Sequence, residues 1–184
     1  MKGTIQDFFK EDIRVKQESI EALTEKIMEL AALFEKTFND GHKIIVFGNG
    51  GCAGIAQQMT AAFTGRFKSG KTARPVLCLC ADASHITTLS NDYGFENIFV
   101  KQLEAFLKEG DVVVGLSTSG NSANVVKGME YAKEKGAFTI GFTGEKGGKL
   151  NSIADFLLKV PSTQPSHIES TFSVVNALLC KLID

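Results

Sequence analysis

The sequence predicts one α/β domain built on a parallel sheet of five strands, with helices on both faces. Five short apolar runs of strand length alternate along the chain with segments whose apolar residues recur at helical spacing. This regular alternation favours parallel strands joined by right-handed helical crossovers. Two of the strands run directly into turns rich in glycine, serine and asparagine. Since ligands bind such sheets outside the carboxyl ends of the strands, these turns form the candidate site.

Length, composition and charge exclude several classes of protein. The chain has 184 residues, 43% hydrophobic and 22% charged, with a formal net charge of −1. That charge gives no electrostatic footprint for nucleic acid. No apolar run is long enough to span a membrane, no signal peptide opens the chain, and the four cysteines form no C-x-x-C pair. We therefore expect a cytoplasmic protein without a nucleic-acid or membrane partner.

Residues 4–38 are expected to form one long helix that ends at Asn39–His42, with Gly41 as its C-cap. Such a helix can bury its apolar stripe against its own domain. A helix this long, ahead of a compact body, more often packs on a second subunit as well, so we expect an oligomer. The stripe follows the a and d positions of a heptad repeat and consists of Ile13, Ile20, Leu23, Ile27, Leu30 and Phe34.

The α/β body is expected to span residues 43–184. Its five predicted strands are 43–47, 75–80, 111–116, 138–142 and 156–160. Helical spacing predicts helices after residue 52, near 98–107, after residue 122 and over about 167–183. Ser84 is expected to cap a further short helix, and 91–95 to form a polar loop.

The first strand runs into the glycine-rich turn Gly48-Asn-Gly-Gly51. Glycines allow the backbone to approach a ligand closely or to adopt a positive φ. The turn is not a G-x-G-x-x-G motif, and no lysine follows it as in a Walker loop, so nucleotide binding is weakly supported.

The third strand ends in the hydroxyl-rich turn Gly115–Val126, which contains Ser117, Thr118, Ser119 and Ser122. The free backbone N–H groups and the dipole of the following helix make such a turn an anion site. No Lys or Arg lies inside the turn, so neutral donors would hold the anion, which suits a phosphate on a small metabolite. An ordinary N-cap is the simpler interpretation, but this density of hydroxyls favours phosphate binding. Both turns lie at carboxyl ends and can meet, together with the loop 91–95.

These motifs resemble the sugar isomerase (SIS) family, and within it the phosphoheptose isomerases. The resemblance covers nearly the whole chain. It implies a flavodoxin-like, doubly wound SIS domain over residues 1–184, with 1–38 as an oligomerisation helix, in a homotetramer. It also implies conversion of sedoheptulose 7-phosphate into an aldoheptose 7-phosphate, an early step toward the heptose of lipopolysaccharide or other surface glycans. The motifs that carry it are Gly48–Gly51, Thr64–Arg66, Asn91–Phe95, Gly110–Asp111, Ser117–Asn124, Thr143–Gly144 and Gly147–Gly148.

The resemblance also assigns roles to individual residues. The phosphate of the sugar would be held by Ser117, Thr118, Ser119 and Ser122, in agreement with the interpretation of the turn above. The sugar itself would be lined by Asn49, Gly50, Gly51, Asn91 and Asp92, and Arg66 matches a family arginine near the site.

Several family positions carry other residues here. In the helix after the glycine-rich turn, the family has a metal-binding His and, four residues on, a catalytic Glu, where this chain has Gln58 and Ala62. In the last helix, a family Gln and, eight residues on, a His are replaced by Glu169 and Ala177.

Two further positions differ in the same way, since a family His is Phe172 and the serine after the glycines is Cys52. Zinc needs about four ligands of His, Cys or carboxylate type. The zinc site of the family therefore looks lost, and we expect no metal and no other cofactor.

Three hypotheses about function remain open. In the first, the chain is a phosphosugar isomerase that has rebuilt its acid–base pair. Glu169 and Asp92 are the catalytic candidates, and Glu169 would also contact the substrate. His85 is a further candidate, but a capping or packing role is the simpler interpretation of that residue. In the second, it is a catalytically silent phosphosugar-binding protein that regulates or scaffolds a protein partner. In the third, it joins an active paralogue in a mixed tetramer.

Overall fold

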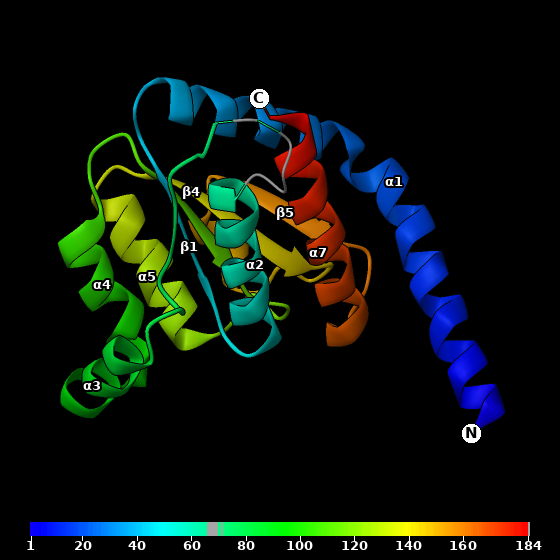
Figure 1. Ribbon diagram of the computed structural model, residues 1–184. Coiled ribbons are helices and arrows are strands. Elements are labelled where there is room, and N and C mark those ends of the chain that lie inside the picture. The colour runs from blue at the N-terminus through cyan, green and yellow to red at the C-terminus, as the bar shows by residue number, and fades with distance from the viewer. Residues whose placement is uncertain (66–69, 71, 184) are drawn as a thin grey trace.

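The computed structural model describes residues 1–65, 70 and 72–183 and confirms a five-stranded, fully parallel sheet with a long N-terminal helix (Figure 1). The strand order is β2-β1-β3-β4-β5, which is the flavodoxin-like order. The chain leaves β1 once toward β2 and later returns to place β3 on the other side of β1. The carboxyl ends of β1 and β3 therefore border the switch point where ligands bind in such sheets.

The elements lie close to their predicted places. The strands are β1 Ile44–Gly48, β2 Val76–Cys78, β3 Val112–Leu116, β4 Phe138–Gly144 and β5 Phe156–Val160. The helices are α1 Lys2–Asn39, α2 Gly51–Gly65, α3 Ala83–Tyr93, η2 Phe95–Asn97, α4 Ile98–Phe106, α5 Ala123–Glu134, α6 Leu150–Ile153 and α7 Pro165–Leu182.

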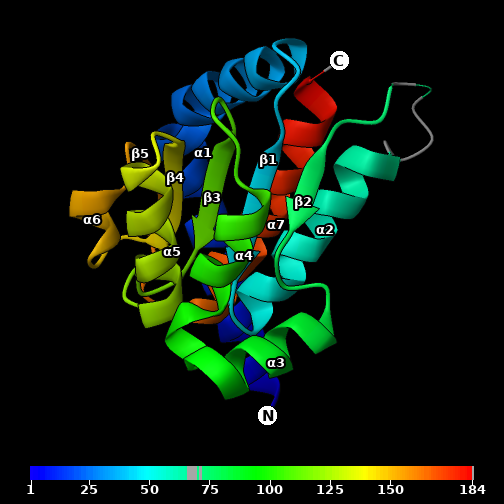
Figure 2. The same cartoon turned by 90° about the vertical axis from the view of Figure 1, so that its left-hand side faces the viewer.

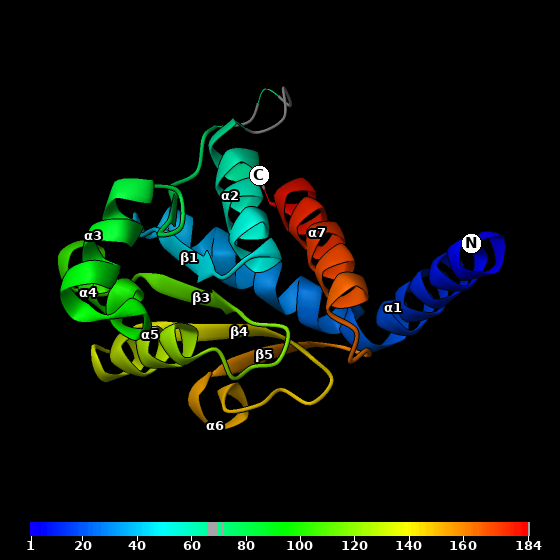
Figure 3. The ribbon, with the colours of Figure 1, turned by 90° about the horizontal axis from the view of Figure 1, so that it is seen from below.

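Two apolar cores cover the two faces of the sheet (Figure 3). Helices α1, α2 and α7 cover one face, where the rings of Phe142 and Phe172 pack 5.5 Å apart. Helices α4, α5 and α6 cover the other face, where Phe47 and Phe99 stack at 4.6 Å. Because the central strands β1 and β3 are buried at every position, their residues are apolar without alternation.

The register of the sheet brings the two candidate turns to the same level. Ile44 pairs with Val112 and Gly48 with Leu116, so β1 and β3 end side by side (Figure 2). The glycine-rich turn and the hydroxyl-rich turn therefore start next to each other at one edge of the sheet.

Helix α1 is only partly packed on the body. Leu23, Leu30 and Phe34 of the predicted stripe are buried, whereas 55% of Ile13 and 67% of Ile20 remain exposed. The first turns of α1 extend past the edge at which the strands end (Figure 1). The C-terminal half of the stripe thus packs on the α/β body, whereas Ile13 and Ile20 in its N-terminal half face outward.

Three local predictions were wrong. Ser84 does not cap α3; instead the side chain of Asp82 accepts hydrogen bonds from the backbone N–H groups of Ser84 at 2.8 Å and His85 at 3.1 Å. The predicted loop 91–95 is the last turn of α3 followed by η2. Strand β2 is shorter than 75–80, because only Val76–Cys78 pair with β1.

Asp111 stabilises the other end of the strands, where β1 and β3 begin. Its side chain is 2% exposed. Its carboxylate accepts hydrogen bonds from the backbone N–H groups of Lys108 at 2.8 Å and Lys43 at 3.1 Å. The ammonium group of Lys43 forms an ion pair with the same carboxylate. This side chain therefore joins the starts of β1 and β3.

Replacement of Asp111 by alanine is expected to lower the free energy of unfolding by about 3 kcal/mol, because buried N–H groups lose their acceptor. Urea unfolding measures the loss. Asp40→Ala removes the exposed ion pair with Lys36 and is the control, with an expected loss below about 0.5 kcal/mol. Equal losses in the two variants would contradict this role of Asp111.

Candidate functional site

The turn after β3 gathers three serine hydroxyls. The Oγ atoms of Ser117 and Ser122 are 3.0 Å apart, and those of Ser117 and Ser119 are 3.5 Å apart. Ser122 occupies the N-cap position of α5, but its side chain makes no capping hydrogen bond. The simple capping interpretation therefore does not explain this hydroxyl. Hydroxyls grouped at the start of a helix are suited to bind an anion.

The shape of this turn depends on the turn that follows β4. Gly120 has a φ of 66°, and a Cβ atom on it would overlap the carbonyl oxygen of Gly147. The backbone N–H of Leu150 donates to the carbonyl of Gly120 at 3.2 Å, and that of Lys149 to Asn121 Oδ1 at 3.0 Å. Position 120 thus requires glycine for both its backbone conformation and its close contact.

A reciprocal pair of amide hydrogen bonds joins the two candidate turns. Nδ2 of Asn49 donates to Oδ1 of Asn124 at 2.8 Å, and Nδ2 of Asn124 donates to Oδ1 of Asn49 at 2.8 Å. The backbone N–H of Val125 also donates to Asn124 Oδ1, at 2.9 Å. Asn124 is 2% exposed, so the pair fixes the glycine-rich turn against the start of α5.

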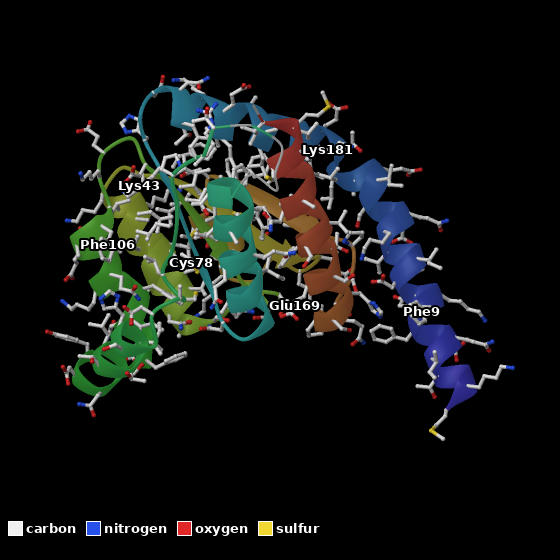
Figure 4. All side chains as sticks on the ribbon, in the orientation of Figure 1. Phe9, Lys43, Cys78, Phe106, Glu169 and Lys181 are labelled. Atoms are coloured by element: carbon white, nitrogen blue, oxygen red, sulfur yellow. The ribbon has the colours of Figure 1, made fainter. Side chains whose placement is uncertain are left out.

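Glu169 brings a carboxylate to the glycine-rich turn from the first turns of α7. A Cβ atom on Gly51 would overlap this carboxylate, and the sulfur of Cys52 lies 3.7 Å from its Oε1. Figure 4 shows Glu169 at the lower end of the molecule, where α2 and α7 both begin. A negative group there is favoured by the dipole of α2.

Two small hollows border these turns. One, of about 190 Å³, is lined by Thr118, Ser119, Lys146 and Ser162, among others. The other, of about 200 Å³, is lined by Gly48–Gly50, Cys80, Phe95 and further apolar residues. The first is more polar than the second, so a phosphate group fits the first better and a carbon skeleton fits the second.

Not every predicted site residue reaches these turns. Asn91 and Asp92 lie exposed on α3, and Nδ2 of Asn91 donates to Asp92 Oδ1 at 2.8 Å. Neither lines either hollow. Arg66 lies outside the described residues. The structure therefore brings together Asn49–Gly51, Ser117–Ser122 and Glu169, while Asn91 and Asp92 lie exposed on α3.

His85 belongs to a different part of the surface. It lines a shallow hollow of about 520 Å³ beside β2 and α3, with Cys78, Gln102 and Phe106. Its Nδ1 lies 3.8 Å from the carboxylate of Asp82. Although this hollow is larger than the two beside the turns, its lining includes no hydroxyl cluster and no glycine-rich turn, so we place the site elsewhere.

Sequence reasoning missed the roles of Cys52 and Asn124. Burial raises the pKa of the Cys52 thiol to about 12, and the nearby charge of Glu169 contributes to the increase. The thiol is therefore protonated at neutral pH. The position of Cys52 directly after Gly51 was a signal that it lies at the site. No pattern in the sequence pairs Asn124 with a residue of the other turn.

The residues at the zinc-site and catalytic positions of the family are not suited to hold zinc in this chain. Gln58 is an exposed amide on α2, Ala62 is fully buried in the apolar core, and Ala177 is exposed on the outer side of α7. Glu169 is the one carboxylate at these four positions. No group of three His, Cys, Asp or Glu side chains able to hold a metal occurs among the described residues. Zinc needs about four such ligands, so the donors present do not suit it.

Comparison with known proteins identifies one family, and several phosphoheptose isomerases are more than 30% identical to this chain. The SIS domain family matches residues 7–144. A phosphoheptose isomerase of Aquifex aeolicus is 40% identical over 184 residues, which cover 100% of this chain and 96% of that protein. The solved phosphoheptose isomerase of Neisseria gonorrhoeae has a TM-score of 0.92 at 36% identity, over 98% of this chain and 96% of that one. That of Francisella tularensis has a TM-score of 0.96 at 32% identity, over 99% and 97%.

Replacement of Gly120 by alanine is expected to lower the free energy of unfolding by more than about 2 kcal/mol, through backbone strain and overlap with Gly147. Gly136→Ala is the matched control. Gly136 has a φ of 79° but no atom within 4 Å of the added Cβ, so about 1 kcal/mol is expected. Thermal and urea unfolding of both variants measure the difference, and equal losses would refute the close contact.

Proposed function

Because the chain belongs to the SIS domain family, we propose that it is a phosphosugar isomerase that interconverts the ketose and aldose forms of a sugar phosphate. Its 40% identity with a phosphoheptose isomerase over the whole chain makes sedoheptulose 7-phosphate the first substrate to test. The product would be an aldoheptose 7-phosphate, which supplies the heptose of surface glycans. The observation that carries the proposal is the meeting of the serine hydroxyls, the glycine-rich turn and Glu169 at one edge of the sheet.

The division of roles follows from the chemistry of each group. The hydroxyls of Ser117, Ser119 and Ser122 bind the phosphate, and Thr118 and Ser119 line the polar hollow beside them. The backbone of Gly48–Gly51 lines the sugar. The amide of Asn49 is already paired with Asn124, so it contributes to the sugar site chiefly through the shape of the turn.

Isomerisation moves a proton between two neighbouring carbons. A base removes a proton from C1 of the ketose while the C2 carbonyl oxygen gains one, which gives an enediol. Return of a proton to C2 and loss of the O1 proton then give the aldose. Glu169 is the better candidate base, because its carboxylate touches the glycine-rich turn, whereas Asp92 is exposed on α3 and bonded to Asn91.

Replacement of both Ser119 and Ser122 by alanine is expected to weaken binding of sedoheptulose 7-phosphate by about 10²-fold, because two hydrogen bonds to a charged phosphate are lost. Calorimetric titration measures the dissociation constant. Thr87→Ala removes an exposed hydroxyl on α3 that donates to a backbone carbonyl of its own helix, and should bind as the wild type does. Unchanged affinity of the double variant would place the phosphate elsewhere.

The same wild-type protein tests isomerisation when it is incubated with the sugar phosphate in D₂O and followed by NMR. Deuterium at C1, or the appearance of aldoheptose phosphate, identifies an isomerase. Binding without exchange would instead identify a phosphosugar-binding regulator or the structural partner of an active paralogue.

We also propose that the chain forms a homotetramer through α1. The division of the single domain into an N-terminal helix, residues 1–38, and an α/β body, residues 43–184, stays a prediction. Phe9 and Ile13 are 64% and 55% exposed on the part of α1 that leaves the body (Figure 4 labels Phe9). An apolar groove of about 280 Å³ lies between α1 and α7 and includes Ile20 and Leu178. A second copy is the proposed occupant, since an apolar stripe that continues beyond its own core suits helix pairing between like chains.

Introducing charge into this stripe is expected to dissociate the oligomer. Phe9→Glu combined with Ile13→Glu should reduce the mass measured by light scattering from four chains toward one, because two buried carboxylates would be unpaired. Gln6→Glu with Lys10→Glu changes charge at exposed positions on the same segment and should leave the mass unchanged. A wild-type monomer would contradict the assembly.

No helix in the described part of the chain is long and apolar enough to cross a membrane. We propose the cytoplasm as its compartment, because all four cysteines are free thiols, as is usual in a reducing environment.

A further inference from the structure

Cys52 is the side chain that joins the carboxylate of Glu169 to the two turns. Its sulfur lies 3.7 Å from Glu169 Oε1, and the backbone of Thr118 is near enough to oppose the rise in the pKa of the thiol. Cys52 is 4% exposed and follows directly after Gly51, whose missing Cβ leaves the space that the carboxylate occupies. One thiol therefore touches α7, the hydroxyl-rich turn and the first turn of α2.

The state of this thiol determines what it can do. Burial and the charge of Glu169 raise its pKa to about 12, so it is a poor nucleophile near neutral pH. A protonated thiol has one hydrogen to donate, and the carboxylate oxygen of Glu169 accepts it.

We propose that Cys52 is a positioning residue that holds the Glu169 carboxylate in place for proton transfer from the sugar. The inference rests on the proposed function, in which Glu169 is the base. The S–H group fixes Oε1 and leaves Oε2 without that bond. The side chain of glutamate has three rotatable bonds, so a free carboxylate can adopt many orientations. A carboxylate held by a defined contact spends more time aligned with the carbon whose proton it removes than a free one does.

A matched control exists on the same pair of helices. Cys180 is another buried thiol of α7, and its sulfur donates to the backbone carbonyl of Ala62 on α2 at 3.3 Å. Replacement of Cys180 by alanine removes a thiol contact between α2 and α7 without touching Glu169. A purely structural role of Cys52 would be mimicked by this variant.

The first experiment compares Cys52→Ala, Cys52→Ser, Cys180→Ala and Glu169→Gln in the deuterium-exchange reaction with sedoheptulose 7-phosphate. We expect Cys52→Ala to lower kcat by about tenfold with KM within about twofold, because the phosphate contacts are intact. Cys52→Ser restores a donor and should recover most of kcat, while Cys180→Ala should match the wild type. Wild-type kcat in Cys52→Ala would overturn the positioning role.

The second experiment does not depend on turnover. Alkylation of Cys52 by iodoacetamide, followed by mass spectrometry of its peptide, reports the thiolate fraction at each pH. Glu169→Gln removes the negative charge next to the thiol, so its pKa should fall and Cys52 should react faster at a given pH than in the wild type. An unchanged rate would show that the two side chains are not in contact, and would overturn the inference.

Together the two experiments separate this inference from the proposed function. Loss of exchange in Glu169→Gln with full activity in Cys52→Ala keeps the isomerase and refutes the positioning role. Absence of exchange in the wild type overturns the isomerase and, with it, any catalytic role of Cys52.

Discussion

The reciprocal amide pair between Asn49 and Asn124 is the contact on which the whole candidate site depends. The two residues follow different strands, and their paired amides are the side-chain contact that joins the two turns. The sheet register places Gly48 beside Leu116, and the amide pair then converts neighbouring strand ends into one rigid surface. Because Asn124 is almost fully buried, both amides must be satisfied internally, which makes the arrangement specific as well as stable.

The fold was readable from the sequence because its signals are repeated and local. The central strands gave continuous apolar runs, and most of the crossover helices gave a 3.6-residue period. The errors fell at the boundaries around α3, where Asp82, not Ser84, closes the helix start and Asn91 and Asp92 remain helical. Those details depend on the backbone geometry of single turns, which residue types alone do not determine.

The site was only partly readable for a different reason. The hydroxyls of Ser117, Ser119 and Ser122 are close in sequence, so their chemistry could be inferred before their positions were known. Glu169 and Cys52 are separated by 117 positions, and their contact exists only because α2 and α7 begin at the same edge of the sheet. Long-range contacts of this kind follow from topology, and sequence spacing carries no trace of them.

The hydroxyl-rich turn takes its form from backbone features, namely the positive φ of Gly120 and the hydrogen bonds of Lys149 and Leu150. None of these involves the faces of α2 and α7 that carry Gln58, Ala62, Glu169 and Ala177. The contacts that shape the phosphate-binding turn are therefore different from the side chains at these four positions. Substitutions on the helix faces can accumulate one at a time while that turn stays intact, so a lineage with this architecture can change what it does to a phosphorylated ligand without ever losing its hold on it.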